Sequence, residues 1–206
     1  MTPLRPQVVA AALIPPAGRV AVGLIGLRDT RRQFVQAVVL SLSIFGCCFV
    51  AAPAARADRP AIVPHRLERG VLMEVNALRR QHGLVPLRRS PGLAAAARRH
   101  STEMASRGYF GHRSADGSSF ARRIARFYPS TGYRSWWVGE NLLYSTSPLD
   151  AARALDMWLN SPDHRRIILA ARWREFGLGA VEAASAPGVY GGQAVTIVTT
   201  DFGVRR

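Results

Sequence analysis

An apolar stretch near the N-terminus most limits the folds open to this chain. Both cysteines lie inside this stretch, so the domain that follows it must fold without any cysteine. Residues 31–57 begin with two arginines, continue in an almost unbroken apolar run over 35–52, and end in Ala-Arg-Ala. A positive start, an apolar run and a small-x-small end predict a signal peptide over 31–57. Cys47 and Cys48 both lie inside it, so the 149 residues that follow contain no cysteine. They must be held together by their own core rather than by disulfides.

Other interpretations of this segment stay open. The run over 35–52 is close to membrane-spanning length, so a retained anchor is the alternative to cleavage. A lipoprotein signal at Cys47 fits less well, because Phe45 is bulky and apolar residues continue past the cysteine. Residues 1–30 form a long leader that either lacks regular structure or precedes the true start. A cleaved signal predicts a secreted or periplasmic protein that contacts the membrane only transiently, through this segment.

The chain is strongly basic, and arginine supplies all of its basic residues. It has 28 arginines and a formal net charge of +15. From Asp58 onward there are 22 arginines and 12 acidic residues, and most of these arginines occur as scattered pairs. No run of five or six like charges and no nucleic-acid motif is present. We therefore expect a solvated arginine-rich surface and no nucleic-acid partner. Adhesion to anionic polymers or lipid head groups would be a by-product of that charge.

Helical signals dominate the first part of the remaining chain. Residues 58–66 are rich in Pro and Arg and are interpreted as a linker. Cap residues and apolar spacing then predict five helices. They run from Leu67 to about Gly83, from Ser90-Pro91 to about Gly108, from Ser118 or Ser119 to Phe127, behind a capping box at 147–150, and from Ser161-Pro162 onward.

Strand signals dominate the last part of the chain. Phe176 to Val181 and Gln193 to Phe202 are rich in β-branched residues and glycine, with turn residues between them. This texture predicts two antiparallel strands joined by a loop. Helices first and strands last indicate an α+β domain over 67–206 in which helices pack on a sheet.

Five short segments follow one another along this domain. They are GYFGH (108–112), GENLL (139–143), WLNSPDHRRIIL (158–169), WREFGLGA (173–180) and TTDFG (199–203). Their order and spacing resemble the signature segments of the CAP superfamily, which includes cysteine-rich secretory proteins (SCP domain), venom allergens and pathogenesis-related proteins. The likeness is to its cysteine-free bacterial branch and covers roughly 67–204. It implies a three-layer α-β-α sandwich with a central antiparallel sheet and a cleft.

The resemblance also implies a site. In many members of the superfamily the cleft holds two histidines and two acidic residues, and His112, Glu140 and His164 match three of these positions. The fourth would fall near Asn160 or Ser161, and neither is acidic. Two imidazoles and a carboxylate suit zinc or another divalent metal, with open positions for water. The alternative is a buried polar network in which these side chains satisfy one another.

Two functions of different classes are compatible with these residues. The first is an exported binding module whose cleft holds a divalent ion and whose ligand is a lipid, a glycan or a protein. Trp136, Trp137, Asn160 and Ser161 are expected to line that cleft. The second is a metal-assisted hydrolase acting on peptides or cell-wall material. The missing fourth acid, and the lack of a G-x-S-x-G elbow or an H-E-x-x-H helix, favour the binding module.

Overall fold

The structure is a computed structural model that describes residues 7–10, 61–62 and 65–206, with side chains described for 66–206. The predicted signal peptide lies outside the described residues. The helices are α1 (His65–Gln81), α2 (Pro91–Arg107), α3 (Phe120–Ala125), α4 (Ala151–Leu159), α5 (Pro162–Ile168) and the short 3-10 helix η1 (Gly188–Tyr190). The strands are β1 (Gln7–Ala10), β2 (Ala61–Ile62), β3 (Arg88–Arg89), β4 (Trp136–Ser145), β5 (Glu175–Ala183) and β6 (Val195–Arg205).

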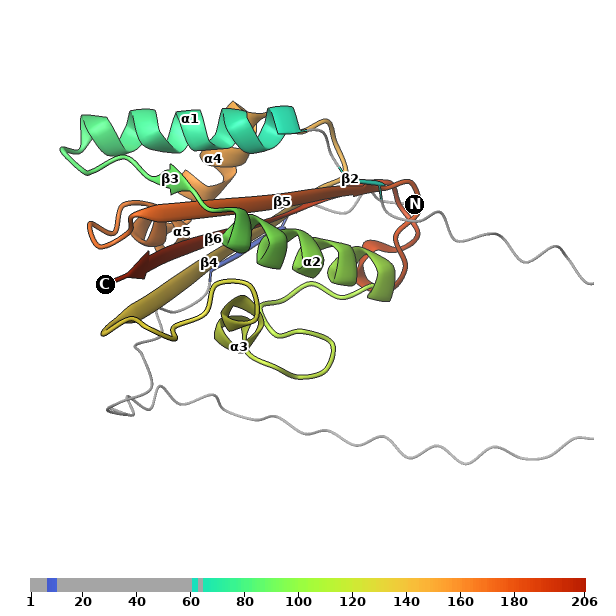
Figure 1. The fold of residues 1–206 in the computed structure, drawn as a ribbon. Helices are drawn as coiled ribbons and strands as arrows, with labels where there is room; N and C mark the ends of the chain where they lie inside the picture. Colours follow the sequence, from blue (N-terminus) through green and yellow to red (C-terminus); the bar gives the residue numbers. More distant parts are fainter. Residues whose placement is uncertain (1–6, 11–60, 63–64) are drawn as a thin grey trace, which may run out of the picture. The chain divides into compact units, whose positions relative to one another are not determined.

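One sheet organises the described chain. Its strand order is β1-β4-β6-β5-β2, and β3 pairs with β5 in parallel. The three long strands are antiparallel neighbours, with β6 between β4 and β5 (Figure 1). Since β6 hydrogen-bonds on both sides, residues of β4 and β5 are brought together through it. The TTDFG segment, which is part of β6, therefore lies at the centre of the sheet.

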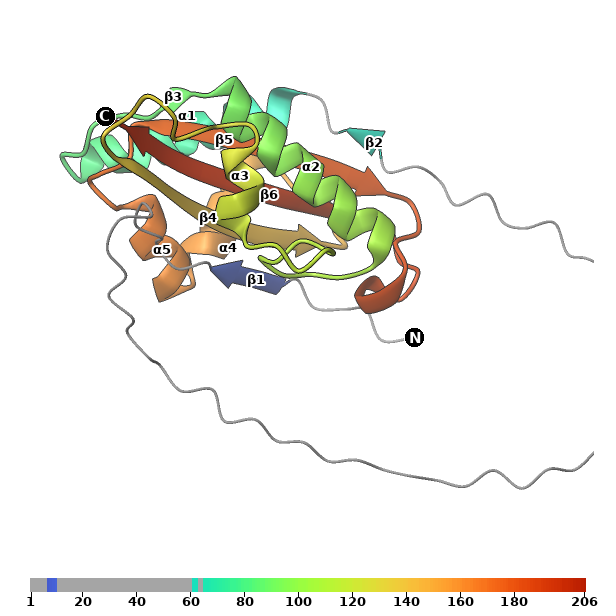
Figure 2. The same cartoon turned by 60° about the horizontal axis from the view of Figure 1, so that its bottom comes forward.

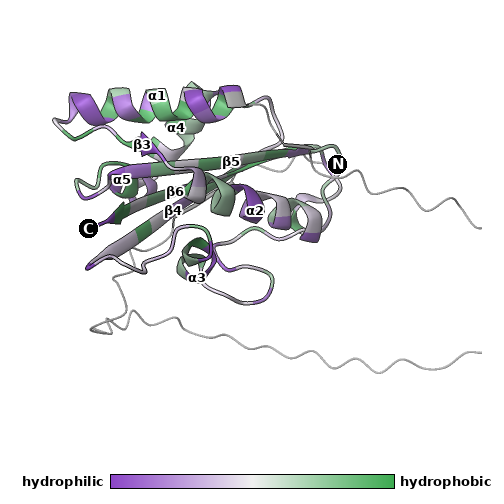
Figure 3. Cartoon of the chain, viewed as in Figure 1, coloured by the Kyte–Doolittle hydropathy of each residue, from purple (hydrophilic) through white to green (hydrophobic). Residues whose placement is uncertain are grey.

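Helices cover both faces of this sheet. On one face, α1, α4 and α5 pack on it in a core that includes Val75, Trp158 and Phe176. On the other face lie α2 and α3, with Met104 and Ile124 buried against the strands (Figures 1 and 2). The strands are mostly apolar in Figure 3, as expected for strands buried on both faces, whereas α1 and α2 alternate between polar and apolar residues. The α+β fold with a three-layer α-β-α arrangement is thus confirmed.

Helix starts agree with the predicted caps at three positions, because Ser161 precedes α5, which begins at Pro162, and the same holds for Ser90 and Ser119. Ser90 precedes α2, where its Oγ accepts a hydrogen bond from the N–H of Leu93 at 3.5 Å, and Gly108 ends that helix in a left-handed conformation. Ser119, one of the two predicted caps, precedes α3. The capping box at 147–150 is wrong: Asp150 is itself the N-cap and accepts from the N–H of Arg153 at 2.8 Å. An aspartate carboxylate directly before the helix satisfies the free N–H groups without help from residue 147.

Other differences concern elements that lack a periodic signal. Phe127 lies beyond the end of α3 and is exposed rather than buried. Strand β4 was not predicted, because nearly all of its residues are buried and its sequence shows no alternation. Two short strands, β1 and β2, come from segments interpreted as leader and linker. None of the helices in the described part of the chain has the length and apolar composition that a membrane span requires.

Candidate functional site

Strand β4 sends alternate side chains to opposite faces of the sheet, and this decides the geometry of the site. Val138 packs with α2 and α3, whereas a side chain at Gly139 would meet Trp173 on the other face. Glu140 therefore points to the α2–α3 face, where it is completely buried. A buried carboxylate needs partners, because its charge is costly to remove from water.

Two side chains supply those partners. His112, in the loop after α2, places Nδ1 2.8 Å from Oε1 of Glu140. Since a carboxylate oxygen only accepts hydrogen bonds, Nδ1 carries the proton. Arg123 in α3 donates from Nη2 to Oε2 of Glu140, and its side chain is 2% exposed. Both carboxylate oxygens are thus occupied, one by an imidazole and one by a guanidinium.

Arg123 also ties the loop to the helix. Its Nη1 donates to the backbone carbonyl of His112 at 3.1 Å and to Oγ of Ser114 at 3.0 Å. Burial acts to raise the pKa of Glu140, but the charge of Arg123 and the hydrogen bond from His112 outweigh it, so that pKa lies below its ordinary value. Glu140 is therefore an ionised carboxylate neutralised by an internal cation.

A second carboxyl group lies beside this pair. Asp201 of β6 is directly opposite Glu140 in the strand register and is also completely buried. Burial and the negative charge of Glu140 raise the pKa of Asp201 well above its ordinary value. The same region holds His100 of α2, whose Nε2 is 2.9 Å from the carbonyl of Gly111 and whose pKa burial lowers to about 4. The cluster therefore consists of one ion pair surrounded by neutral polar groups.

Asp201→Asn is expected to stabilise the protein at neutral pH. The folded chain keeps the proton of Asp201, whereas the unfolded chain releases it above an ordinary pKa of about 3.9. Between that value and the raised folded pKa, the contribution of Asp201 to the free energy of unfolding falls as pH rises. Asparagine keeps the shape but has no proton to lose. Urea unfolding between pH 5 and 8 should show a higher stability for Asp201→Asn at the upper end, with no gain for the exposed control Asp156→Asn; equal gains would contradict this.

His164 does not join the cluster. It lies in α5, which packs on the other face of the sheet. Its backbone carbonyl accepts a hydrogen bond from the side-chain amide of Asn141 at 3.3 Å. Because Glu140 and Asn141 are consecutive in β4, their side chains point to opposite faces. Throughout the described residues, no group of three or more His, Cys, Asp or Glu side chains could hold a metal ion. The structure therefore brings His112 and Glu140 together but leaves His164 apart.

The four residues expected to line a ligand cleft are also distributed over three places. Trp136 is buried on the α2–α3 face and donates from its indole nitrogen to the carbonyl of Tyr128 at 2.8 Å. Trp137 packs on the other face beneath the guanidinium of Arg172, 4.7 Å from its ring centre. Asn160 and Ser161 form the connection between α4 and α5. These residues do not share one cavity wall.

Two residues of the cluster were not identified from the sequence. Arg123 was interpreted as half of a solvated pair with Arg122, although its spacing from Phe120 and Ile124 places it on the buried side of a helix. Asp201 is an acidic residue in the middle of a strand that is buried on both faces. An ionisable residue on the buried side of a helix, or in the middle of a buried strand, was the signal that could have identified both residues. Buried charges are rare unless they are paired, so such a residue indicates a partner nearby.

The family of the chain follows from comparison with known proteins. A family model described as CAP, cysteine-rich secretory protein family, matches residues 72–199, which is more than half of the chain. The chain belongs to this family. The match begins inside α1 and ends in β6, so it contains Glu140, His112 and Arg123 and reaches all three long strands.

Individual relatives come from bacteria. The uncharacterized protein YkwD of Bacillus subtilis is 33% identical over 120 residues, which are 57% of this chain and 44% of the relative. The uncharacterized membrane protein YlbC of the same organism is 30% identical over 112 residues, or 54% of this chain and 31% of the relative. The matched part of this chain thus spans less than half the length of either curated relative.

A solved structure supports the fold. An outer surface protein from Borrelia burgdorferi superposes with a TM-score of 0.57 at 18% identity, covering 71% of this chain and 99% of that chain. At this identity the likeness concerns the arrangement of helices and strands alone. It agrees with the sheet covered on both faces that is seen here.

Proposed function

We propose that this CAP-family protein is a binding module that works outside the cytoplasm, and that its signature residues form a structural network. The observation that carries this proposal is the occupation of both Glu140 oxygens by His112 and Arg123. A hydrolase of the metal-assisted class needs a carboxylate or imidazole that faces an activated water. Here the carboxylate is buried and already neutralised. The description of the family as secretory proteins supports the proposed location.

The donor set fits a divalent metal poorly. Two buried imidazole nitrogens on this face of the sheet, Nε2 of His112 and Nδ1 of His100, have no hydrogen-bond partner among the described residues. An ion that also used Glu140 would compete with Arg123 for this carboxylate, and a displaced Arg123 would keep its positive charge buried without a counter-ion. Breaking a buried ion pair in this way is strongly unfavourable. A binding role for the module therefore does not depend on a metal at this site.

Zinc titration of the full-length protein tests the proposal. We expect the same heat of zinc binding from the wild type, His112→Ala, His164→Ala and the control His82→Ala, which removes an exposed histidine. The physical reason is that the described residues offer no site with three ligands for His112 to complete. Saturable binding that is lost only in His112→Ala or His164→Ala would contradict the proposal. So would hydrolysis of peptide or cell-wall material that stops on chelation and returns with zinc.

A further inference from the structure

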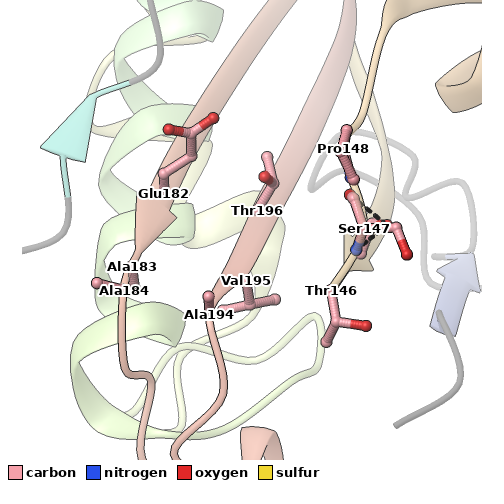
Figure 4. A pocket seen from close by; sticks show the side chains of 10 residues that line it. Thr146, Ser147, Pro148, Glu182, Ala183, Ala184, Ala194, Val195 and Thr196 are labelled. Atoms are coloured by element: carbon pink, nitrogen blue, oxygen red, sulfur yellow. Dashed lines mark hydrogen bonds between the residues drawn. The ribbon is translucent and has the colours of Figure 1, made fainter. Parts of the chain in front are cut away.

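A pocket of about 470 Å³ opens at the end of the sheet, where β4 and β5 end and β6 begins (Figure 4). It is separate from the Glu140 cluster. Val181 and Ile197, the chain neighbours of Glu182 and Thr196, pack on the α2 side of the sheet. Glu182 and Thr196, which line the pocket, therefore point to the opposite face, which carries α1 and α4. Neither the signature segments nor the predicted cleft residues line it. It is therefore a site with its own chemistry.

Strand register places polar groups side by side in this pocket. Thr196 of β6 lies directly opposite both Ser145 of β4 and Glu182 of β5. Because neighbouring strands are about 4.8 Å apart, these three side chains form a polar row about 10 Å wide. The Oγ of Ser145 is engaged with the backbone of Ser147, donating to its carbonyl at 2.9 Å. Thr196 and Glu182 remain directed toward the pocket, as Figure 4 shows.

The charge of the pocket is opposite to that of the protein. The chain has 28 arginines, yet no basic residue is present among the described residues that line the pocket. Its one charged lining residue is Glu182, which is exposed and whose carboxylate has no ion pair or hydrogen bond in the described part of the chain. An anionic ligand would be repelled here and attracted by the arginines elsewhere. The pocket thus selects for a cation.

The remaining wall restricts the kind of cation. Pro148, Ala184 and Ala194 supply small apolar surfaces in the pocket, and no aromatic ring is present among the described lining residues. A quaternary ammonium group is typically held by aromatic rings. A primary ammonium instead has three N–H donors, which suit a carboxylate and hydroxyl acceptors. Its methylene chain can lie along the apolar surface.

We propose that this pocket binds a primary ammonium group carried on a short aliphatic chain, with the Glu182 carboxylate and the Thr196 hydroxyl as its acceptors. This inference rests on the proposed binding function and names the ligand class. The ammonium could come from a free diamine or from a lysine-type side chain of a peptide, and both present the same chemistry to Glu182.

Calorimetric titration of the full-length protein at low ionic strength tests this inference. The probes are 1,5-diaminopentane, Nα-acetyl-lysine amide, and two molecules of similar length that lack the ammonium, 1,5-pentanediol and glutarate. We expect both amines to bind and the diol and glutarate not to bind. Binding of the diamine alone would assign the pocket to free diamines, and binding of both amines would extend it to peptide side chains. Absence of binding by either amine would overturn the inference.

Variants place the binding in the pocket. Glu182→Gln is expected to weaken amine binding about tenfold, because it removes a charge-assisted hydrogen bond. Glu74→Gln removes the same charge from an exposed position on α1 and should leave the affinity unchanged. Equal affinities for the wild type and Glu182→Gln would overturn the proposed site. The zinc result is independent, since a metal at His112 would contradict the proposed function without changing amine binding.

Discussion

Glu140→Gln should lower the free energy of unfolding by about 3–5 kcal/mol, the usual cost of removing one partner from a buried ion pair. The side chain of Arg123 is 2% exposed, so its guanidinium would lose its counter-ion without gaining access to water. The loss should spread beyond the pair, because Arg123 also holds the carbonyl of His112 and the hydroxyl of Ser114. Urea unfolding followed by tryptophan fluorescence at neutral pH measures the change.

A double variant separates the charge from the shape. Arg123→Met combined with Glu140→Gln leaves no uncompensated charge, so it should be more stable than either single variant. Arg122→Met, at the exposed neighbouring position, should change stability by less than about 0.5 kcal/mol. A double variant that loses as much as the sum of the two single losses would show that the pair is not coupled, and would contradict this account of the cluster.

Gly179→Ala should destabilise the protein by about 3 kcal/mol or more, at or beyond the upper end for overpacked cores. A methyl group on Gly179 would lie 2.1 Å from the backbone nitrogen of Arg98 and 2.2 Å from its Cα. These are atoms of the α2 backbone, which cannot rotate away as a side chain can. Helix α2 would have to move off the sheet, taking with it the helix face that covers Asp201.

The control for this substitution is available in the same chain. Gly111→Ala adds the same methyl group where no atom lies within 4 Å, and Gly111 has no positive φ. We expect it to be close to neutral. Thermal unfolding monitored by circular dichroism compares the two variants directly. Similar melting temperatures for Gly179→Ala and Gly111→Ala would mean that α2 does not rest on β5 as closely as the structure indicates.

The boundaries of α2 and the starts of α3 and α5 could be predicted from the sequence because their signals are local. Ser90 caps the start of α2 before Pro91, and Gly108 ends the helix after Arg107. Both act on groups within one helical turn, so the sequence around them is enough to predict the helix ends. The same holds for β5 and β6, whose β-branched residues and flanking glycines mark two strands. Strand β4 has no comparable mark, since burial on both faces removes the alternation on which prediction depends.

The sequence by itself determined the family and the α+β class, because ordered signature segments and local caps are properties of the chain; that His112 and Glu140 share a site was only what the family resemblance implied, and their contact is seen in the structure. Only the tertiary structure decided the composition of the site. Alternation along β4 sends Glu140 and Asn141 to opposite faces, which separates Glu140 from α5 and His164. Pairing with β6 brings Asp201 beside Glu140, and packing of α3 brings Arg123 into the position of an internal cation. Charge neutralisation in a buried site depends on which side chains lie next to one another in the fold. The order of residues along the chain does not show which residues these are.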